Sequence, residues 1–281
     1  MDLTRLNSPI LFKGNATYAY RDPAAVYHEG RIYLYITRSE LTADGTYYNQ
    51  TALSTSRDLV HWTEPVPITP RDRSLNYSSP GNVIRFEDQW VLCLQSYPTP
   101  NGETFGNASS RLFTMRSDDL VHWSEPELLR VKGPDVPVAA MGRMIDPYLL
   151  EDADIPGRWW CFYKQRGVSI SYSDDLRTWT YAGRADAGEN VTVIRDGGEY
   201  VMFHSPKNGI GVKRSTRPDR WGEDVDWLTL DQASWPWAQG RLTAATVLDL
   251  TDVPTVGTYL MFFHGSTKKG LARHPAHGAA S

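Results

Sequence analysis

The sequence predicts an all-β fold in which five small sheets form a ring, a five-bladed β-propeller. Three observations predict it: an apolar strand pattern occurs five times, a turn ending in Trp follows in four copies, and only the last copy lacks its outer strand. The chain has 281 residues, and propellers of this length commonly form one unit. We therefore predict that residues 1–281 form a single propeller domain.

The repeated strand is apolar or aromatic along most of its length, and each copy follows a turn rich in Gly, Asp or Pro. Such turns are typical of hairpins that join two antiparallel strands. A third strand with small and polar residues in alternation follows each copy, the last at Gly270–Arg273. The five copies of the apolar strand are Arg31–Ile36, Gln89–Leu94, Arg158–Tyr163, Glu199–His204 and Thr258–Phe263.

A turn closed by Trp then opens the fourth strand of four repeats. Because this turn recurs in blade after blade, we interpret it as structural: the Asp caps the turn and the Trp packs between blades. The fifth repeat has no such turn, so we expect the N-terminal segment Pro9–Phe12 to supply the missing strand and close the ring. The four turns are Asp58–Trp62, Asp119–Trp123, Asp175–Trp179 and Pro218–Trp221.

Composition limits the possible partners and the location. A formal net charge of −4 without charged blocks argues against a nucleic-acid or anionic-membrane partner. Cys93 and Cys161 lie in apolar runs, which predicts buried thiols rather than a disulfide or a metal pair. No signal-like segment follows Met1 and no run is long enough to span a membrane, so we expect a cytoplasmic protein, although a secreted chain without its signal would look the same. The sequence leaves the oligomeric state open.

The first strand of each blade lines the axis of a propeller, so the residues that open these strands converge at one end of the channel. Here the repeat stops being repetitive, and Asp22, Asp146, Glu189 and Arg241 stand at matching points of four blades. The five openings are Arg21–Pro23, Ser79–Asn82, Ile145–Pro147, Gly188–Val191 and Gly240–Thr243.

Three carboxylates that converge on one cleft repel one another, so at least one should be protonated near neutral pH while another is ionised. Cleavage of a glycosidic bond requires this division between an acid and a base. Glu189 has the longest reach and is assigned the acid. Asp22 is assigned the base, and Asp146 is assigned to tune Glu189 and contact the sugar. Arg241 could orient Glu189 or bind a substrate hydroxyl.

Other polar and aromatic side chains near the strand openings are candidates for sugar binding. Tyr18 and Tyr20 flank the first acid and could form a stacking wall. Trp235 and Trp237 lie on a long loop that could overhang the mouth, where packing of one Trp into the core is an equal alternative. The candidates for substrate contact are Tyr18, Tyr20, Asn82, Arg143, Asn190, His204, Trp237 and Arg241.

This combination of openings and turns resembles the glycoside hydrolase family 43 superfamily, whose relatives include families 32, 62, 68 and 117. The resemblance covers nearly the whole chain and implies a general base at Asp22, a pKa modulator at Asp146 and a general acid at Glu189. It also implies inversion of configuration, with arabinofuranosides and xylosides as usual substrates. One departure is that Asn190 and Val191 follow Glu189, where the family usually has Gly-Pro; the family 32 motifs are absent.

Two histidines are alternatives suggested by the same resemblance. In family 117 a His embedded in a blade is thought to act as the acid, so His204 and His264 are candidates for that role. His264 also resembles the axial His that helps to hold a calcium or sodium ion in the channel through water, although hard cations prefer oxygen ligands. We expect no required cofactor, and a structural calcium or sodium ion as an option.

We therefore expect a glycosidase acting on the ends of short oligosaccharides or on small glycosides. One alternative is a glycoside phosphorylase on the same architecture, in which a basic pocket would replace the base carboxylate. A second is a carbohydrate-binding propeller without activity. Lectin propellers tend to repeat their binding residues in each blade, whereas here the mouth is asymmetric, which favours catalysis.

Overall fold

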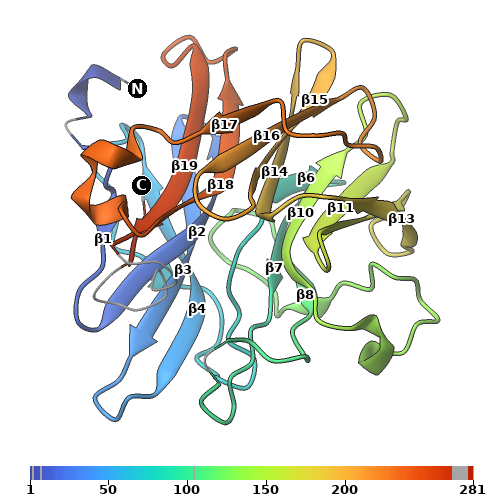
Figure 1. The fold of residues 1–281 in the computed structure, drawn as a ribbon, viewed down its shortest axis with the longest axis horizontal. Helices are drawn as coiled ribbons and strands as arrows, with labels where there is room; N and C mark the ends of the chain where they lie inside the picture. Colours follow the sequence, from blue (N-terminus) through green and yellow to red (C-terminus); the bar gives the residue numbers. More distant parts are fainter. Residues whose placement is uncertain (2, 7, 104, 268–277, 281) are drawn as a thin grey trace.

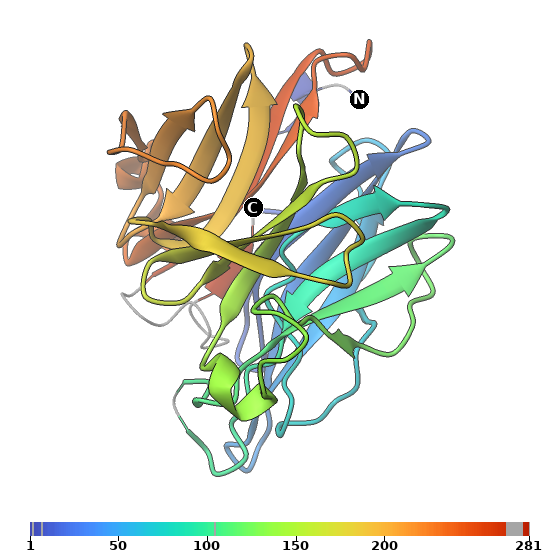
Figure 2. The same ribbon diagram turned by 90° about the vertical axis from the view of Figure 1, so that its right-hand side faces the viewer.

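The computed structural model describes residues 1, 3–6, 8–103, 105–267 and 278–280, and it contains five four-stranded antiparallel sheets around a common centre (Figures 1 and 2). The prediction of a five-bladed β-propeller is confirmed. Helical structure in the described part is limited to short 3-10 turns: η1 (Leu3–Arg5), η2 (Val138–Met141), η3 (Gln232–Ser234) and η4 (Pro236–Ala238). Among the described residues, no helix has the length and apolar character needed to cross a membrane.

The blades follow one another along the chain, and in each of the first four the strands pair in sequence order. Blade one contains β2 (Tyr18–His28), β3 (Arg31–Leu41), β4 (Tyr47–Ser56) and β5 (Val66–Pro67). Blade two contains β6 (Val83–Phe86), β7 (Gln89–Gln95), β8 (Leu112–Ser117) and β9 (Glu127–Leu128). Blade three contains β10 (Ile145–Glu151), β11 (Trp159–Lys164), β12 (Val168–Ser173) and β13 (Thr180–Ala185). Blade four contains β14 (Glu189–Asp196), β15 (Glu199–Ser205), β16 (Ile210–Ser215) and β17 (Asp226–Leu228).

Blade five joins the two ends of the chain. It contains β18 (Arg241–Leu250), β19 (Thr258–Ser266), β20 (Gly278–Ala280) and, as its outer strand, β1 (Phe12–Lys13). Phe12 pairs with Ala280 and Lys13 with Ala279, so an N-terminal strand closes the ring as expected, although it is formed by Phe12–Lys13 rather than Pro9–Phe12. The third strand expected at Gly270–Arg273 lies outside the described residues.

The core is divided among the interfaces between blades. The second strand of each blade supplies large buried side chains, such as Leu34, Leu92 and Phe162, which accounts for its apolar sequence. One cluster of buried side chains lies between each pair of neighbouring blades, for example Tyr35 and Leu92 between blades one and two. Burying each such side chain stabilises the fold by roughly 1.5–3 kcal/mol, so the ring is held together mainly where blades meet.

The turns closed by Trp have the structural role that their repetition predicts. Asp58 accepts the backbone N–H groups of Val60 and His61 at 3.0 and 2.8 Å, and Asp119 and Asp175 cap their turns in the same way. The Trp of a turn then packs against the preceding blade. The ring of Trp123 lies 5.5 Å from that of Tyr35, centroid to centroid.

Candidate active site

Asp22 and Asp146 are held at the hub by the same backbone device. Each begins a β-bulge in the inner strand of its blade, with a φ of 50° at Asp22 and 51° at Asp146, and each is followed by Pro. Asn190, with a φ of 52°, takes this position in blade four. Glu189 therefore lies one residue before the bulge position that the two aspartates occupy. This corrects the expectation from the sequence that the three acids stand at equivalent points of their blades. Strained backbone of this kind costs on the order of 1–3 kcal/mol and is typical of functional sites.

Asp22 is buried and strongly stabilised as a carboxylate. Its side chain is 5% exposed, and its Oδ2 accepts hydrogen bonds from the hydroxyls of Thr37 and Ser79, both at 3.0 Å. Arg21 Nη1 lies 3.4 Å from the same oxygen. Burial opposes ionisation, but the Arg21 charge and the hydrogen bonds outweigh it and hold the pKa of Asp22 below its ordinary value. Asp22 is thus ionised at neutral pH.

Asp146 has the opposite electrostatic environment. The residue is 8% exposed, and its backbone N–H donates to Gln95 Oε1 at 2.6 Å. Burial, followed by the negative charges of Glu189 and Asp22, raises the pKa of Asp146 to about 8, and the Arg143 and Arg21 charges offset only part of this rise. Asp146 is therefore the carboxyl that holds a proton at neutral pH.

Glu189 stands on blade four and is the most accessible of the three acids, with a side chain that is 31% exposed. Its Oε1 is paired with Arg241 Nη2, and Arg241 Nε also donates to the Lys207 carbonyl. The residue before it must be Gly188, because a Cβ there would lie 2.2 Å from the Ser205 carbonyl carbon. The close approach of the two strands therefore fixes where Glu189 leaves the sheet.

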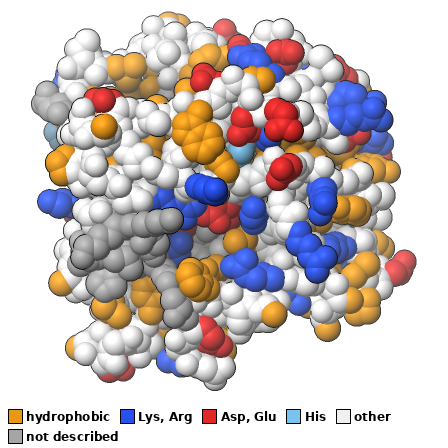
Figure 3. Space-filling model, in the orientation of Figure 1, with side chains coloured by type: hydrophobic (Ala, Val, Ile, Leu, Met, Phe, Trp, Pro, Cys, Tyr) orange, Lys and Arg blue, Asp and Glu red, His pale blue; other side chains and the backbone are white. Residues whose placement is uncertain are grey.

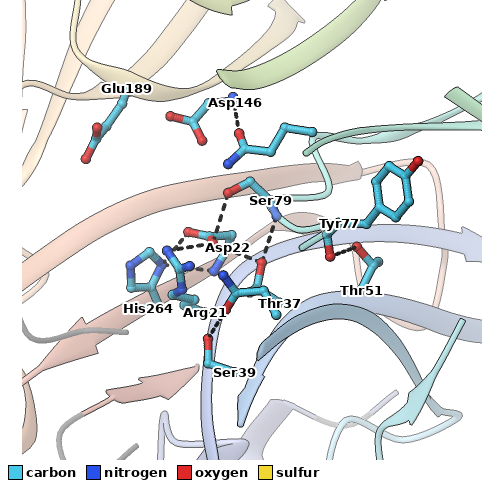
Figure 4. A network of polar contacts seen from close by, with 12 residues as sticks. Arg21, Asp22, Thr37, Ser39, Thr51, Tyr77, Ser79, Asp146, Glu189 and His264 are labelled. Carbon is cyan, nitrogen blue, oxygen red and sulfur yellow. Dashed lines mark hydrogen bonds and ion pairs between the residues drawn. The ribbon is translucent and has the colours of Figure 1, made fainter. Parts of the chain in front are cut away.

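The three acids face one cavity at the hub. Figure 4 shows Asp22, Asp146 and Glu189 on strands of three different blades, and all three line this cavity. The cavity has a volume of about 280 Å³, near the lower end of the roughly 300–1,000 Å³ common for small-molecule sites. It is lined by Arg21, Asp22, Ser79, Gln95, Tyr97, Phe105, Arg143, Ile145, Asp146, Lys164, Glu189, Asn190, Arg241 and His264.

His264 orients Asp22 through the backbone. Its Nδ1 accepts the Asp22 N–H at 3.1 Å, and burial lowers the pKa of His264 to about 4, so the ring is neutral at pH 7 with its proton on Nε2. Thr37 Oγ1 accepts the Ser79 N–H at 2.8 Å in the same way. Gln95 Oε1 likewise accepts the Asp146 N–H. In three blades, therefore, the segment that opens the inner strand is held by a side chain from the preceding blade.

This arrangement of His264 does not fit direct coordination of a cation by its ring. Its Nδ1 lone pair is already used by the Asp22 N–H, and the protonated Nε2 has no lone pair to offer a metal. No group of three or more His, Cys, Asp or Glu side chains with metal-binding geometry occurs in the described part of the chain.

His204 is likewise engaged in structural contacts. Its Nδ1 accepts the Gly188 N–H at 2.9 Å, and its Nε2 lies 2.9 Å from Asp224 Oδ1. The side chain is 2% exposed, and Lys213 Nζ lies 2.8 Å from the same Asp224 oxygen. His204 therefore supports the hairpin that carries Glu189, and both ring nitrogens are occupied away from the cavity.

Several candidates for sugar contact lie outside the cavity lining. Asn82 joins blades two and three through the backbone of Leu149, donating at 2.7 Å and accepting at 2.9 Å. Trp237 stacks on Trp235 with 5.3 Å between ring centroids and packs against blade five. The remaining two are near-neighbours in β2: Tyr20 packs on Phe12, and Tyr18 lies under the Arg38 guanidinium.

The structure also brings in residues that sequence reasoning did not single out. Arg21, Ser79, Gln95, Tyr97, Phe105 and Lys164 all line the cavity. Arg21 and Ser79 belong to predicted strand openings, so the sequence did contain a signal that places them near the mouth. Gln95 and Lys164 end the second strands of their blades, and in propeller topology that end faces the mouth. Tyr97 and Phe105 lie on a loop with no repeat signal.

Comparison with solved structures shows the same fold across low sequence identity. A glycosyl hydrolase from Bacteroides ovatus matches at 14% identity with a TM-score of 0.69, covering 100% of this chain and 88% of that one. A family 43 β-xylosidase/α-arabinofuranosidase from a compost microbial metagenome matches at 12% identity and a TM-score of 0.63, covering 96% and 94%.

A third structure comes from a report that the GH130 family of mannoside phosphorylases contains glycoside hydrolases that target β-1,2 mannosidic linkages in Candida mannan. It matches at 14% identity and a TM-score of 0.66, covering 98% of this chain and 92% of that one. At these identities the likeness concerns the fold alone. None of the curated protein sequences matches this chain.

The sequence profile described as glycosyl hydrolases family 43 matches residues 15–171, more than half of the chain. The matched segment contains Asp22 and Asp146, and Glu189 follows it on the next blade. An acidic hub cavity in a five-bladed propeller agrees with that assignment. This chain is therefore a glycosidase that belongs to glycosyl hydrolase family 43.

Proposed function

We propose that this glycosidase inverts configuration and removes terminal sugars from small oligosaccharides or glycosides, with arabinofuranosides and xylosides as the first substrates to test. The observation that carries the proposal is that Asp22, Asp146 and Glu189 line one cavity, in surroundings that lower the pKa of Asp22 and raise that of Asp146. The cavity volume of about 280 Å³ favours a small sugar over a long polymer.

In this mechanism Asp22 is the base and Glu189 the acid. Asp22 takes a proton from a water molecule whose oxygen attacks the anomeric carbon, while Glu189 protonates the leaving oxygen as the glycosidic bond breaks. At neutral pH Asp146 holds a proton, because its pKa is raised by burial and then by the Glu189 and Asp22 charges, and it passes this proton to Glu189 before the leaving oxygen is protonated. Glu189 is the more exposed of the two, so it can reach the leaving group. No cofactor is needed in this scheme.

A phosphorylase is the second candidate, because the cavity is rich in cationic side chains: Arg21, Arg143, Lys164 and Arg241. However, Asp22 occupies the place of the base, where an attacking phosphate would meet an ionised carboxylate. A role restricted to carbohydrate binding is disfavoured by the asymmetry of the hub, since the acids occur on three blades only.

A panel of 4-nitrophenyl glycosides, assayed with and without inorganic phosphate, tests the proposal. We expect release of nitrophenol without phosphate, and NMR of the first product formed should show the anomer opposite to that of the substrate. Turnover that depends on phosphate would establish the phosphorylase instead. Retention of configuration would contradict the roles given to Asp22 and Glu189.

A further inference from the structure

The cavity contains more positive charge than its acids balance. Of its four cationic side chains, Arg21 is paired with Asp22 and Arg241 with Glu189. Arg143 and Lys164 form no ion pair with a carboxylate among the described residues. Their described polar contacts are to backbone carbonyls only: Arg143 Nε to Gly106 at 3.2 Å and Lys164 Nζ to Ala187 at 3.3 Å.

The backbone segments that carry Arg143 and Lys164 are neighbours in blade three. Lys164 is the backbone partner of Ile145, and Arg143 comes two residues before Ile145. Gln165, next to Lys164, donates from Nε2 to the carbonyls of Met141 and Arg143, both at 3.0 Å. The loop that carries Arg143 is therefore fastened to the end of the strand that carries Lys164.

A stacking contact also orients Arg143. Its guanidinium carbon lies 5.6 Å from the centroid of the Tyr97 ring, and Tyr97 itself lines the cavity. An oriented guanidinium and an ammonium group that line one cavity are donors typical of oxyanion recognition. Lys and Arg side chains surround a hollow near the centre of the face shown in Figure 3, with acidic side chains visible at its floor.

The charge of the neighbouring acids does not remove this excess. Asp146, the acid nearest in sequence to Arg143, is protonated at neutral pH, because its pKa is raised by burial and by the Glu189 and Asp22 charges. Asp22 and Glu189 are already matched by their own arginines. A neutral sugar would thus leave two desolvated cations in the cavity without a counter-charge, which is costly.

We propose that Arg143 and Lys164 form a subsite for a sugar carboxylate, so that the substrate carries a hexuronic acid unit at or beside the cleaved bond. This inference rests on the proposed glycosidase function and specifies its substrate class. A carboxylate is favoured over inorganic phosphate, because the substrate of a glycosidase is a sugar, and a sugar carboxylate brings the anion and the sugar into the cavity as one ligand. The planar carboxylate also matches the donor geometry of Arg143.

Two pairs of sugars that differ mainly by one carboxylate provide the test. D-Glucuronate is compared with D-xylose, and D-galacturonate with L-arabinose, by isothermal titration calorimetry at low salt. At least one acid should bind about tenfold or more tightly than its neutral partner, the gain expected from a charge-assisted hydrogen bond. Arg143→Gln and Lys164→Gln should each lose most of this preference, measured as the ratio of the affinities for the acidic and the neutral sugar.

Arg166→Gln is the matched control, because Arg166 is an exposed cation two residues from Lys164 and does not line the cavity. It should retain the full preference. The proposal would be overturned if acidic and neutral sugars bound with equal affinity, or if neither acid bound detectably. It would also be overturned if the two variants lost affinity equally for the acidic and the neutral sugar. Displacement of the acid by millimolar phosphate, with turnover that requires phosphate, would also overturn it.

Binding is measured here without turnover, so the two hypotheses can fail separately. If neutral glycosides are hydrolysed and the acids show no preference, the subsite is refuted and the glycosidase mechanism stands. If the acids bind as expected and no glycoside is cleaved, the proposed mechanism fails while the carboxylate subsite is supported.

Discussion

Asp146→Asn and Asp22→Asn should change the stability of the protein in opposite directions. Both residues occupy the same bulge position with a φ near 50°, which Asn tolerates well. The Asp146→Asn variant would keep the backbone N–H that Gln95 accepts, and the Asp22→Asn variant would keep a side-chain oxygen for Thr37 and Ser79. The pair of variants therefore isolates the effect of charge.

The sign for Asp146 follows from its raised pKa. A carboxyl whose pKa is higher in the folded state stabilises the fold below its unfolded pKa, and this contribution is lost as the pH rises through the folded value. The rise from 3.8 to about 8 corresponds to a ceiling of about 6 kcal/mol of destabilisation in the wild type above pH 8. Asp146→Asn should therefore match the wild type near pH 4 and gain stability progressively toward pH 9.

Asp22 behaves in the reverse way because its pKa is lowered. Its contribution is present above its unfolded pKa and is lost as the pH falls through the folded value. Removing this charge leaves Arg21 buried without its partner, which typically costs about 3 kcal/mol. Asp22→Asn should thus be less stable than the wild type at pH 7 and above, and the difference should shrink in acid.

Urea unfolding followed by tryptophan fluorescence at pH 4.5, 7 and 9 measures both effects, since the chain contains ten Trp residues. The free energies of unfolding of the two variants should diverge as the pH rises. If Asp146→Asn gained no stability relative to the wild type between pH 4.5 and 9, or if both variants shifted in the same direction, the electrostatic description of the hub would be wrong.

Three further predictions concern the supports of the site. His264→Phe should destabilise the fold by about 1–3 kcal/mol and lower kcat, because the buried Asp22 N–H loses its acceptor. His264→Asn supplies an oxygen acceptor and should restore much of the stability, measured by urea unfolding, and much of kcat, measured in a kinetic assay. Gly188→Ala should reduce kcat at least tenfold with a small change in KM, since the new Cβ would displace Glu189; normal kinetics would contradict this geometry. Cys93 and Cys161, both buried with raised pKa values, should react with a thiol reagent such as DTNB only after unfolding, and rapid labelling of the native protein would count against their burial.

The fold could be predicted from the sequence because each blade repeats the same physical requirements. The apolar second strand, the hairpin turn before it and the Asp-capped turn with its Trp recur at regular intervals, and their burial and hydrogen bonds match that repetition. Closure by the N-terminus followed from the outer strand missing in blade five, and β1 supplies that strand. The short, irregular strands near the ends of the blades left the exact bounds open.

The candidate site was only partly predictable. Asp22, Asp146, Glu189 and Arg241 all line the cavity, because strand openings converge at the hub of any propeller. The ionisation of each acid depends on side chains from neighbouring blades, such as Thr37 and Ser79, and no repeat pattern indicates those contacts. Trp237 was predicted to contact the sugar, but the aromatic rings of its loop stack on one another and on blade five instead.

The loss of activity in Glu189→Ala, measured on two classes of substrate, tests the central assignment most directly. An acid is needed to protonate a poor leaving group and is nearly dispensable for an activated one. We predict that kcat/KM falls by at least a thousandfold on an unactivated oligosaccharide and far less on a dinitrophenyl glycoside of the same sugar. Equal and small losses on both substrates would contradict a hub at which Glu189 donates the proton.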